Sequence, residues 1–211
     1  MKKVSLLLFC SILLFACKDE IDDSINAEPT TAIVELTTSF GVMHIHLYDS
    51  TPLHKQNFLK LANDGFFDST EFHRIIPNFV IQGGDPNSKD ADRSNDGVGG
   101  PGFTIPAEID SSKFKHKYGA LGAARTGDAT NPERRSSGSQ FYIVTNPNGT
   151  GFLDGNYTVF GEVIKGVDIS KVIERQPRNS KDLPNDRIPM IVKVLNLTQA
   201  QLDKKGLVLP E

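Results

Sequence analysis

Short apolar segments separated by turn-forming residues make up most of this 211-residue chain. Clusters of Gly, Pro, Asn and Asp lie between these segments, and this spacing is typical of short β-strands. From residue 79 onward, these apolar segments are 79–81, 120–124, 141–144, 158–163 and 188–197. Many short strands in a chain long enough for one domain predict a fold dominated by β-structure, a closed antiparallel barrel.

A hairpin and two helices complete the expected architecture. Residues 32–36 and 42–48 are rich in β-branched and apolar residues and are separated by a short turn, which predicts two paired strands. The side chain of Thr51 is suited to cap a helix that ends at Gly65. Residues 167–173 predict a second, shorter helix.

The first residues indicate export from the cytoplasm. Two lysines precede the apolar residues 4–16, a stretch too short to span a bilayer as a stable helix but typical of a signal peptide. Residues 14–17, Leu-Phe-Ala-Cys, resemble the lipobox of bacterial lipoproteins, which implies that Cys17 is acylated and becomes the new N-terminus. The alternative is an ordinary secretory signal followed by an incidental cysteine.

Four regions follow from these patterns. We expect a lipoprotein signal peptide over 1–16, a lipidated cysteine with a flexible tether over 17–31, a folded domain over 32–197 and a C-terminal tail over 198–211. The tether is polar and acidic, with no residues to bury. The expected location is the bacterial cell envelope, on the outer membrane, facing either the periplasm or the exterior.

The charge distribution argues against a nucleic-acid partner. The formal net charge is −3, and the 23 lysines and arginines are spread along the sequence instead of forming a basic patch. Only Cys17 remains in the processed chain, because Cys10 lies inside the signal peptide, so we expect no internal disulfide. We expect the protein to be a monomer.

One run of sequence carries the functional signal. Residues 72–85 read Phe-His-Arg-Ile-Ile-Pro-Asn-Phe-Val-Ile-Gln-Gly-Gly-Asp, which resembles the signature of cyclophilins at nearly every position. Three further stretches of the same family follow the expected order, at residues 57–59, 137–142 and 152–161. The resemblance implies an eight-stranded barrel capped by two helices, and peptidyl-prolyl cis/trans isomerase activity on proline-containing polypeptides, with no cofactor.

The resemblance also implies the roles of individual residues. Arg74 matches the catalytic arginine, Gln82 would hold both Arg74 and a substrate carbonyl, and Phe79 belongs to the pocket for the proline ring. The remaining substrate-binding positions are Val80, Ala124, Arg125, Gln140, Phe141, Tyr142, Phe152, Leu153 and Tyr157. Taken without the motif, the apolar members of this set would be read as ordinary core residues.

Isomerisation of a prolyl bond makes modest chemical demands. Amide resonance sets a rotation barrier of roughly 18–20 kcal/mol, and no bond is made or broken during rotation. In the twisted amide the prolyl nitrogen regains a lone pair, which a fixed guanidinium can meet with an N–H group. A nucleophile, a proton transfer or a metal is therefore not required. The retention of Arg74 with Phe79, Gln82 and Phe141 favours an enzyme over a module that only binds proline-containing segments, because a binding module does not need a donor for the twisted amide. A third, weaker interpretation is a structural or adhesive lipoprotein.

Several residues depart from the family pattern or invite other interpretations. Phe152 stands where many relatives carry the tryptophan that contacts cyclosporin, Val80 replaces a common methionine, and the loops 86–102 and 126–136 are long. His44 and His46 share one face of a strand, but no third ligand accompanies them, so we expect exposed residues and no metal. His73 is expected to face away from Arg74, since neighbours in a strand alternate.

Overall fold

The computed structural model describes residues 28–210. The signal peptide, Cys17 and most of the proposed tether therefore lie outside the described residues. No helix among residues 28–210 is long and apolar enough to cross a membrane. The helices are α1 (Pro52–Asn63), α2 (Asp168–Glu174) and α3 (Gln199–Lys205), and the strands are β1 (Thr31–Thr38), β2 (Gly41–Leu47), β3 (Phe72–Ile76), β4 (Val80–Gly83), β5 (Thr104–Ile105), β6 (Ala120–Ala123), β7 (Ser136–Ser137), β8 (Phe141–Val144), β9 (Val159–Lys165) and β10 (Ile191–Leu197).

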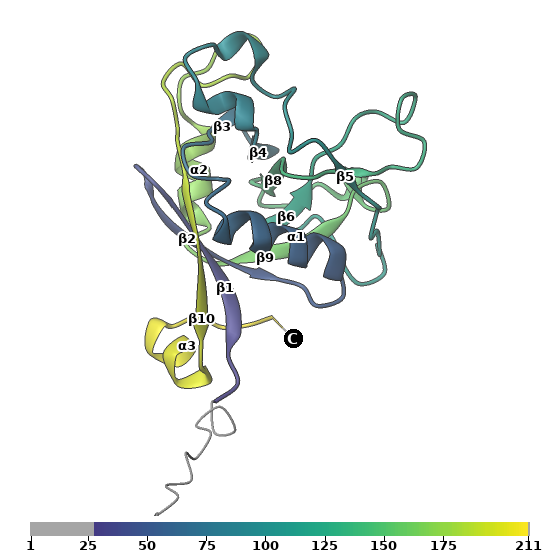
Figure 1. Cartoon of the computed structure of the whole chain (residues 1–211). Helices are drawn as coiled ribbons and strands as arrows, with labels where there is room; N and C mark the ends of the chain where they lie inside the picture. Colours follow the sequence, from purple (N-terminus) through teal and green to yellow (C-terminus); the bar gives the residue numbers. More distant parts are fainter. Residues whose placement is uncertain (1–27, 211) are drawn as a thin grey trace, which may run out of the picture.

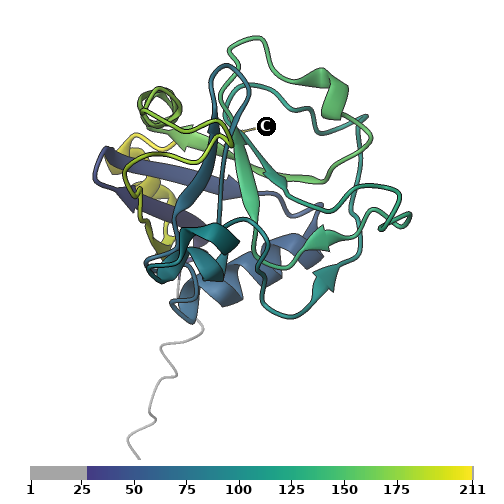
Figure 2. The ribbon, with the colours of Figure 1, turned by 90° about the horizontal axis from the view of Figure 1, so that it is seen from above.

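Eight of these strands form one antiparallel sheet in the order β10-β1-β2-β9-β6-β8-β4-β3. The predicted hairpin is confirmed, because β1 pairs with β2 across a tight turn. Figures 1 and 2 show the sheet curled into a barrel shape, with α1 and α2 on different sides of it. The strands β5 and β7 form a small separate sheet.

The barrel is not strictly closed, which corrects the expectation of a closed one. Its edge strands β3 and β10 do not pair along their lengths. The chain segments just before them meet at an isolated bridge between Glu71 and Pro189, and the backbone N–H of Phe72 donates to Ile188 O at 3.0 Å. These few contacts link the two edges of the sheet near the starts of β3 and β10, although the two strands do not pair with each other.

Alternation along β4 and β8 divides their apolar residues between two clusters. Inward-facing side chains join α1 and α2 in the main core, and outward-facing side chains form a second cluster on the barrel surface. On β4 and β8 the inward set is Ile81, Phe141 and Ile143, and the outward set is Val80, Tyr142 and Val144. The barrel interior is filled, so a ligand must bind on the outside.

Helix α1 begins in an unexpected way. Thr51 occupies the N-cap position, but its side chain makes no capping hydrogen bond and instead donates to the Tyr48 carbonyl at 3.2 Å. The carboxylate of Glu108 accepts the free backbone N–H groups of Leu53 and His54, each at 3.0 Å. The prediction of a Thr51 side-chain cap is therefore wrong, and a residue from a distant loop supplies it.

A third helix occupies part of the C-terminal region, where we expected only a tail. Thr198 and Gln201 form a reciprocal capping box at the start of α3, and Gly206 ends the helix with a left-handed backbone. Leu202 and Leu207 are buried against the barrel in a small cluster with Ile33. The last residues thus pack onto the domain.

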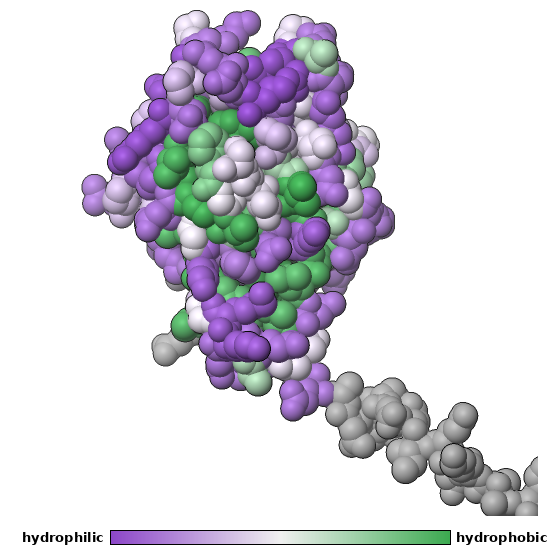
Figure 3. Space-filling model, turned by 90° about the vertical axis from the view of Figure 1, so that its left-hand side faces the viewer, coloured by the Kyte–Doolittle hydropathy of each residue, from purple (hydrophilic) through white to green (hydrophobic). Residues whose placement is uncertain are grey.

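The side of the molecule that carries β2 and α2 is partly apolar. Figure 3 shows patches of apolar side chains there, interrupted by polar ones. Phe40 in the hairpin turn and Ile169 in α2 are partly buried and pack against the main core. Phe40 and Ile169 therefore extend the main core toward this surface. A few exposed apolar residues are normal on a folded domain.

Candidate functional site

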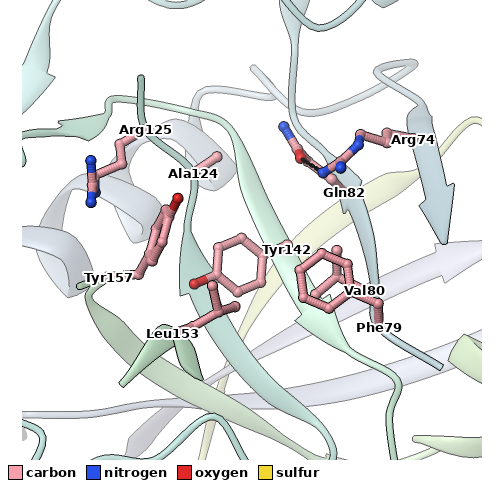
Figure 4. Close-up of a pocket in the computed structure, with 9 residues that line it drawn as sticks. All are labelled: Arg74, Phe79, Val80, Gln82, Ala124, Arg125, Tyr142, Leu153 and Tyr157. Carbon is pink, nitrogen blue, oxygen red and sulfur yellow. Dashed lines mark hydrogen bonds between the residues drawn. The ribbon is translucent and has the colours of Figure 1, made fainter. Parts of the chain in front are cut away.

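A surface pocket of about 130 Å³ lies over the outward faces of β4, β6 and β8. Its lining residues are Arg74, Phe79, Val80, Gln82, Ala124, Arg125, Tyr142, Leu153 and Tyr157, all of them named by the sequence analysis. Figure 4 shows Arg74 and Gln82 at one end of the pocket and Arg125 with Tyr157 at the other. The structure thus brings together most of the predicted site residues, from segments far apart in the sequence.

Arg74 is held by a chain of side-chain hydrogen bonds. Its Nη1 donates to Oε1 of Gln82 at 3.3 Å, which is possible because the two residues are paired across β3 and β4. Gln82 Nε2 in turn donates to Oε1 of Gln140 at 2.9 Å. The guanidinium therefore lies at the pocket rim with its orientation restricted from one side.

Gln140 connects these hydrogen bonds to a glycine-rich loop at residues 96–102. Its Nε2 donates to the carbonyls of Gly97 and Gly99, at 3.1 and 2.8 Å. The Asp85 carboxylate holds the same loop through the N–H groups of those two glycines. A Cβ on Gly99 would lie 2.2 Å from an Asp85 oxygen, so only glycine fits there. The loop is therefore a surface element that supports Gln140.

Aromatic contacts define both rims of the pocket. Phe79 stacks on Phe152 with ring centroids 5.6 Å apart, and Phe152 remains 71% exposed. At the opposite end the guanidinium of Arg125 lies over the Tyr157 ring, 4.4 Å from its centroid. Arg125 also pairs with Asp128 at 2.6 Å, which fixes its orientation. Phe152 is thus a rim residue that lies outside the pocket lining.

The pocket floor corrects one assignment. Phe141 is 1% exposed and packs among Phe58, Phe67 and Phe72 in the main core, so its side chain does not reach the pocket. The next residue, Tyr142, faces outward and forms the floor. Adjacent residues of β8 point to opposite sides of the sheet, so of these two predicted site residues only Tyr142 faces the pocket.

A buried hydrogen-bond chain below Tyr142 was not predicted. The Asp154 carboxylate lies 2.7 Å from Nδ1 of His116, and Nε2 of His116 lies 2.8 Å from the Tyr142 hydroxyl. Burial lowers the pKa of His116, so the ring is neutral and donates through Nδ1 to Asp154, leaving Nε2 to accept from Tyr142. Burial also raises the pKa of Tyr142. The floor of the pocket is therefore fixed and uncharged.

A β-bulge places His73 beside Arg74. The register of β3 against β4 shifts between Phe72 and Arg74, and His73 and Arg74 line the same cavity. The expectation that these two side chains face opposite ways is wrong, because the bulge breaks the alternation. His73 is 4% exposed, and its burial lowers its pKa to about 4, so the ring is neutral.

The other histidines do not form a metal site. His44 and His46 are partly buried, where exposed residues were expected, and Nε2 of His44 lies 3.3 Å from a Glu35 oxygen. Burial lowers the pKa of both. Among residues 28–210 no three His, Cys, Asp or Glu side chains are grouped as metal ligands would be.

Arginines of the second long loop hold local structure. Arg134 donates to the Gly155 carbonyl at 2.9 Å, and Arg135 donates to the carbonyl and the hydroxyl of Thr104 at 2.9 and 2.7 Å. Both side chains are thereby tied to the segments that flank the pocket.

Comparison with known proteins points to one family. Residues 33–195 match the family described as cyclophilin type peptidyl-prolyl cis-trans isomerase/CLD. The chain is 44% identical over 115 residues to peptidyl-prolyl cis-trans isomerase B of Bacillus subtilis, covering 54% of this chain and 70% of that protein. It is 38% identical over 164 residues to peptidyl-prolyl cis-trans isomerase ppi1 of Schizosaccharomyces pombe, covering 77% of this chain and 98% of that protein.

Solved structures give the same result. A cyclophilin type peptidyl-prolyl cis-trans isomerase of Cryptosporidium parvum superposes with a TM-score of 0.68 at 28% identity, covering 81% of this chain and 99% of that one. A second crystal structure of the same protein, obtained in the presence of the dipeptide Ala-Pro, has a TM-score of 0.67. The similarity thus extends over nearly the whole folded domain.

Proposed function

The chain belongs to the cyclophilin-type peptidyl-prolyl cis-trans isomerases, whose reaction is rotation about the amide bond before a proline, and we propose that Arg74 lowers the barrier to that rotation. The observation that carries the proposal is the position of its guanidinium. Arg74 lines a pocket of about 130 Å³ and is oriented by Gln82 at 3.3 Å. A guanidinium held beside this pocket can donate a hydrogen bond to the nitrogen of a proline ring that is bound in it.

The proposed mechanism follows from the electronic change in the amide. As the C–N bond twists, resonance is lost and the prolyl nitrogen becomes a hydrogen-bond acceptor. An N–H group of Arg74 donates to that lone pair, an interaction that neither planar isomer offers. The guanidinium keeps its charge at every working pH, so the interaction needs no proton transfer.

The remaining pocket residues hold the proline ring while its amide turns. Phe79, Val80, Leu153 and the face of Tyr142 provide apolar surface, and the His116–Asp154 chain keeps the Tyr142 ring in place. A shallow pocket on the barrel surface suits a proline within a polypeptide, because the flanking chain can leave at either end. Ala124, Arg125 and Gln140 line the route of that chain.

The energetic demand on this arrangement is small. A ten-thousandfold acceleration needs only about 5.5 kcal/mol of stabilisation that is specific to the twisted amide. One charge-assisted hydrogen bond and the desolvation of the amide in an apolar pocket are together of this order. A nucleophile or a metal adds nothing that the reaction needs.

We further propose that the enzyme acts on exported proteins in the bacterial cell envelope. The signal-peptide pattern and the lipobox at residues 14–17 support this location, with an acyl anchor on Cys17 in the outer membrane. Folding of exported chains is slowed by prolyl isomerisation, so an anchored monomeric isomerase would shorten that step.

A magnetisation-exchange NMR measurement on a proline-containing peptide tests the mechanism. The wild-type protein should exchange the cis and trans resonances, and Arg74→Ala should exchange them at least about tenfold more slowly. A folded Arg74→Ala protein that exchanges them at the wild-type rate would contradict the role of Arg74.

A further inference from the structure

A second cavity of about 360 Å³ adjoins the proline pocket and shares Arg74 and Gln82 with it. It lies beside the end of the pocket that Arg74 occupies, the end opposite Arg125 and Tyr157 in Figure 4. Any polypeptide whose proline occupies the first pocket has flanking residues within reach of this second space. The chemistry of the cavity therefore bears on which flanking residues a substrate carries.

Four segments line the cavity, namely β3, β4, the loop at 93–97 and the turn at 179–183, and hydrogen bonds hold the two loops in place. The backbone N–H of Ile75, next to Arg74 on β3, donates to the Asp182 carbonyl at 2.9 Å. This bond sets the turn at 179–183 against β3. Arg93, from the loop before the glycine-rich stretch, donates to the Asn185 carbonyl at 3.0 Å. The cavity is thus a constructed feature of the fold and not a gap between loose loops.

The charge of its lining is positive. Arg74, Arg93 and Lys181 line the cavity, and Asp96 is its single acidic lining residue. Arg93 lies 3.8 Å from the Asp96 carboxylate, so these two charges offset each other. Lys181 is exposed and has no ion-pair partner among residues 28–210. Arg74 and Lys181 remain as two cations without a carboxylate partner.

Uncharged donors accompany these cations. Ser94, Asn179 and Ser180 line the cavity, and His73 is brought into it by the β-bulge. His73 is 4% exposed, and neither of its ring nitrogens makes a hydrogen bond of acceptable geometry to a described residue, although the Glu71 backbone and the Gln140 side chain are close enough to affect its pKa. A buried imidazole without a partner is costly unless a ligand or water completes it.

We propose that this cavity binds a carboxylate carried by a substrate residue that flanks the proline. The inference rests on the proposed isomerase function of the same site and specifies its preferred substrates as acidic segments. Lys181 and the outer N–H groups of Arg74 contact the carboxylate, and His73 or a serine hydroxyl supplies a neutral donor. The whole protein has a net charge of −3, so a general attraction to acidic peptides is not expected.

A peptide series with one glutamate tests the proposal. In the frame Ala-Ala-Pro-Ala-Ala, each flanking alanine is replaced in turn by Glu or by the neutral isostere Gln, and kcat/KM is measured by NMR exchange at low salt. We expect Glu to exceed Gln by about fivefold to tenfold at positions on one flank only. The preference should shrink at high ionic strength.

Lys181→Gln is the decisive variant, and Lys204→Gln, which removes the same charge from exposed α3, is its control. Lys181→Gln should abolish the Glu preference and leave turnover of the Gln peptides unchanged, whereas Lys204→Gln should leave both unchanged. Equal rates for Glu and Gln peptides, equal preferences on both flanks, or equal effects of the two variants would overturn the proposal.

Parallel binding titrations separate this inference from the catalytic one. If the peptides bind with the expected Glu preference and Lys181 dependence but Arg74→Ala turns them over normally, the role of Arg74 fails and the carboxylate subsite stands. If turnover depends on Arg74 but neither binding nor rate depends on the glutamate, the subsite fails alone.

Discussion

The carboxylate of Glu108 lies 2.6 Å from Nδ1 of His54 and also accepts the backbone N–H of that residue at 3.0 Å. His54 Nε2 continues the contact to the Ser136 hydroxyl at 2.9 Å. One carboxylate therefore replaces the usual N-cap of α1 and satisfies a buried imidazole. Through Ser136 the same contact links α1 to the small β5–β7 sheet beside the pocket.

Glu108→Ala should destabilise the protein by about 2–3 kcal/mol, because it removes a helix cap and leaves the buried His54 N–H unpaired. Glu133→Ala, at a side chain that is 75% exposed, should change the free energy of unfolding by less than about 0.5 kcal/mol. Urea unfolding followed by circular dichroism measures both. Equal losses for the two variants would show that Glu108 is not a structural cap.

This capping contact illustrates what sequence reasoning can and cannot reach. The ordered motifs predicted the fold and the location of the pocket, and local patterns predicted the β1–β2 hairpin and both barrel helices. The partner of His54 lies 54 residues away along the chain, and no local pattern relates the two. Thr51 has the right residue type at the right position, so propensity alone selects it as the cap.

Two other differences have separate physical causes. Residues 141–144 of β8 are buried on both faces, so their apolar pattern does not tell which side faces the core, and Phe141 was assigned to the pocket together with Tyr142. Helix α3 did carry a signal that we overlooked, since Thr198, Gln201 and Gly206 are typical capping residues.

The stability of the protein should fall as the pH decreases from about 6.5 to about 4. Burial lowers the pKa of His73 from 6.5 to about 4, so over this range the unfolded chain binds a proton that the folded protein does not. By linkage, the stability present above pH 6.5 is lost as the pH falls, by about 3 kcal/mol from His73 alone. Urea unfolding at pH 7.0 and at pH 4.5 measures the change.

His73→Gln serves as the control for that measurement, because glutamine does not titrate. Its free energy of unfolding should depend less on pH than that of the wild type. The pKa values of four other histidines are also lowered, namely His44, His46, His54 and His116. The free energy of unfolding of His73→Gln should therefore still decrease as the pH falls, but less steeply than that of the wild type. Identical slopes in the two proteins would refute the contribution of His73.

Cys17→Ser should release the protein from membranes. If residues 14–17 form a lipobox, the wild type partitions into the detergent phase and incorporates labelled fatty acid, since the several acyl chains of a lipoprotein cysteine anchor it stably. The serine variant should do neither and should keep its isomerase activity. A wild-type protein that is recovered in the aqueous phase with a free Cys17 thiol would rule out the anchor.

The wild type should bind cyclosporin weakly, and Phe152→Trp should bind it at least about tenfold more tightly. Phe152 is 71% exposed on the rim and stacks on Phe79, so an indole fits there without disturbing the core and adds the missing N–H donor. The chain has no other tryptophan, so its fluorescence reports binding directly. Strong inhibition of the wild type would show that another contact decides affinity.

Arg74→Ala should lower kcat/KM for a proline peptide by at least about tenfold with little change in thermal midpoint. The side chain is only partly buried and its hydrogen bond to Gln82 is long, at 3.3 Å, so its removal costs the fold little. The lost interaction is with the twisted amide, so peptide affinity should fall less than the rate. NMR exchange and a binding titration on the same peptide separate the two quantities.

Arg74→Lys is the sharper variant, because it retains the charge. A lysine ammonium is a point charge on a flexible stem and cannot donate to Gln82 and to the prolyl nitrogen with the fixed planar geometry of a guanidinium. The variant should therefore remain well below wild-type turnover, although long-range electrostatics are preserved. If lysine restores most of the rate, the acceleration comes from positive charge near the amide and does not require an oriented N–H donor. If a folded Arg74→Ala protein keeps the wild-type rate, the assignment of Arg74 is wrong, and apolar binding of the proline by Phe79, Val80 and Tyr142 has to account for the acceleration.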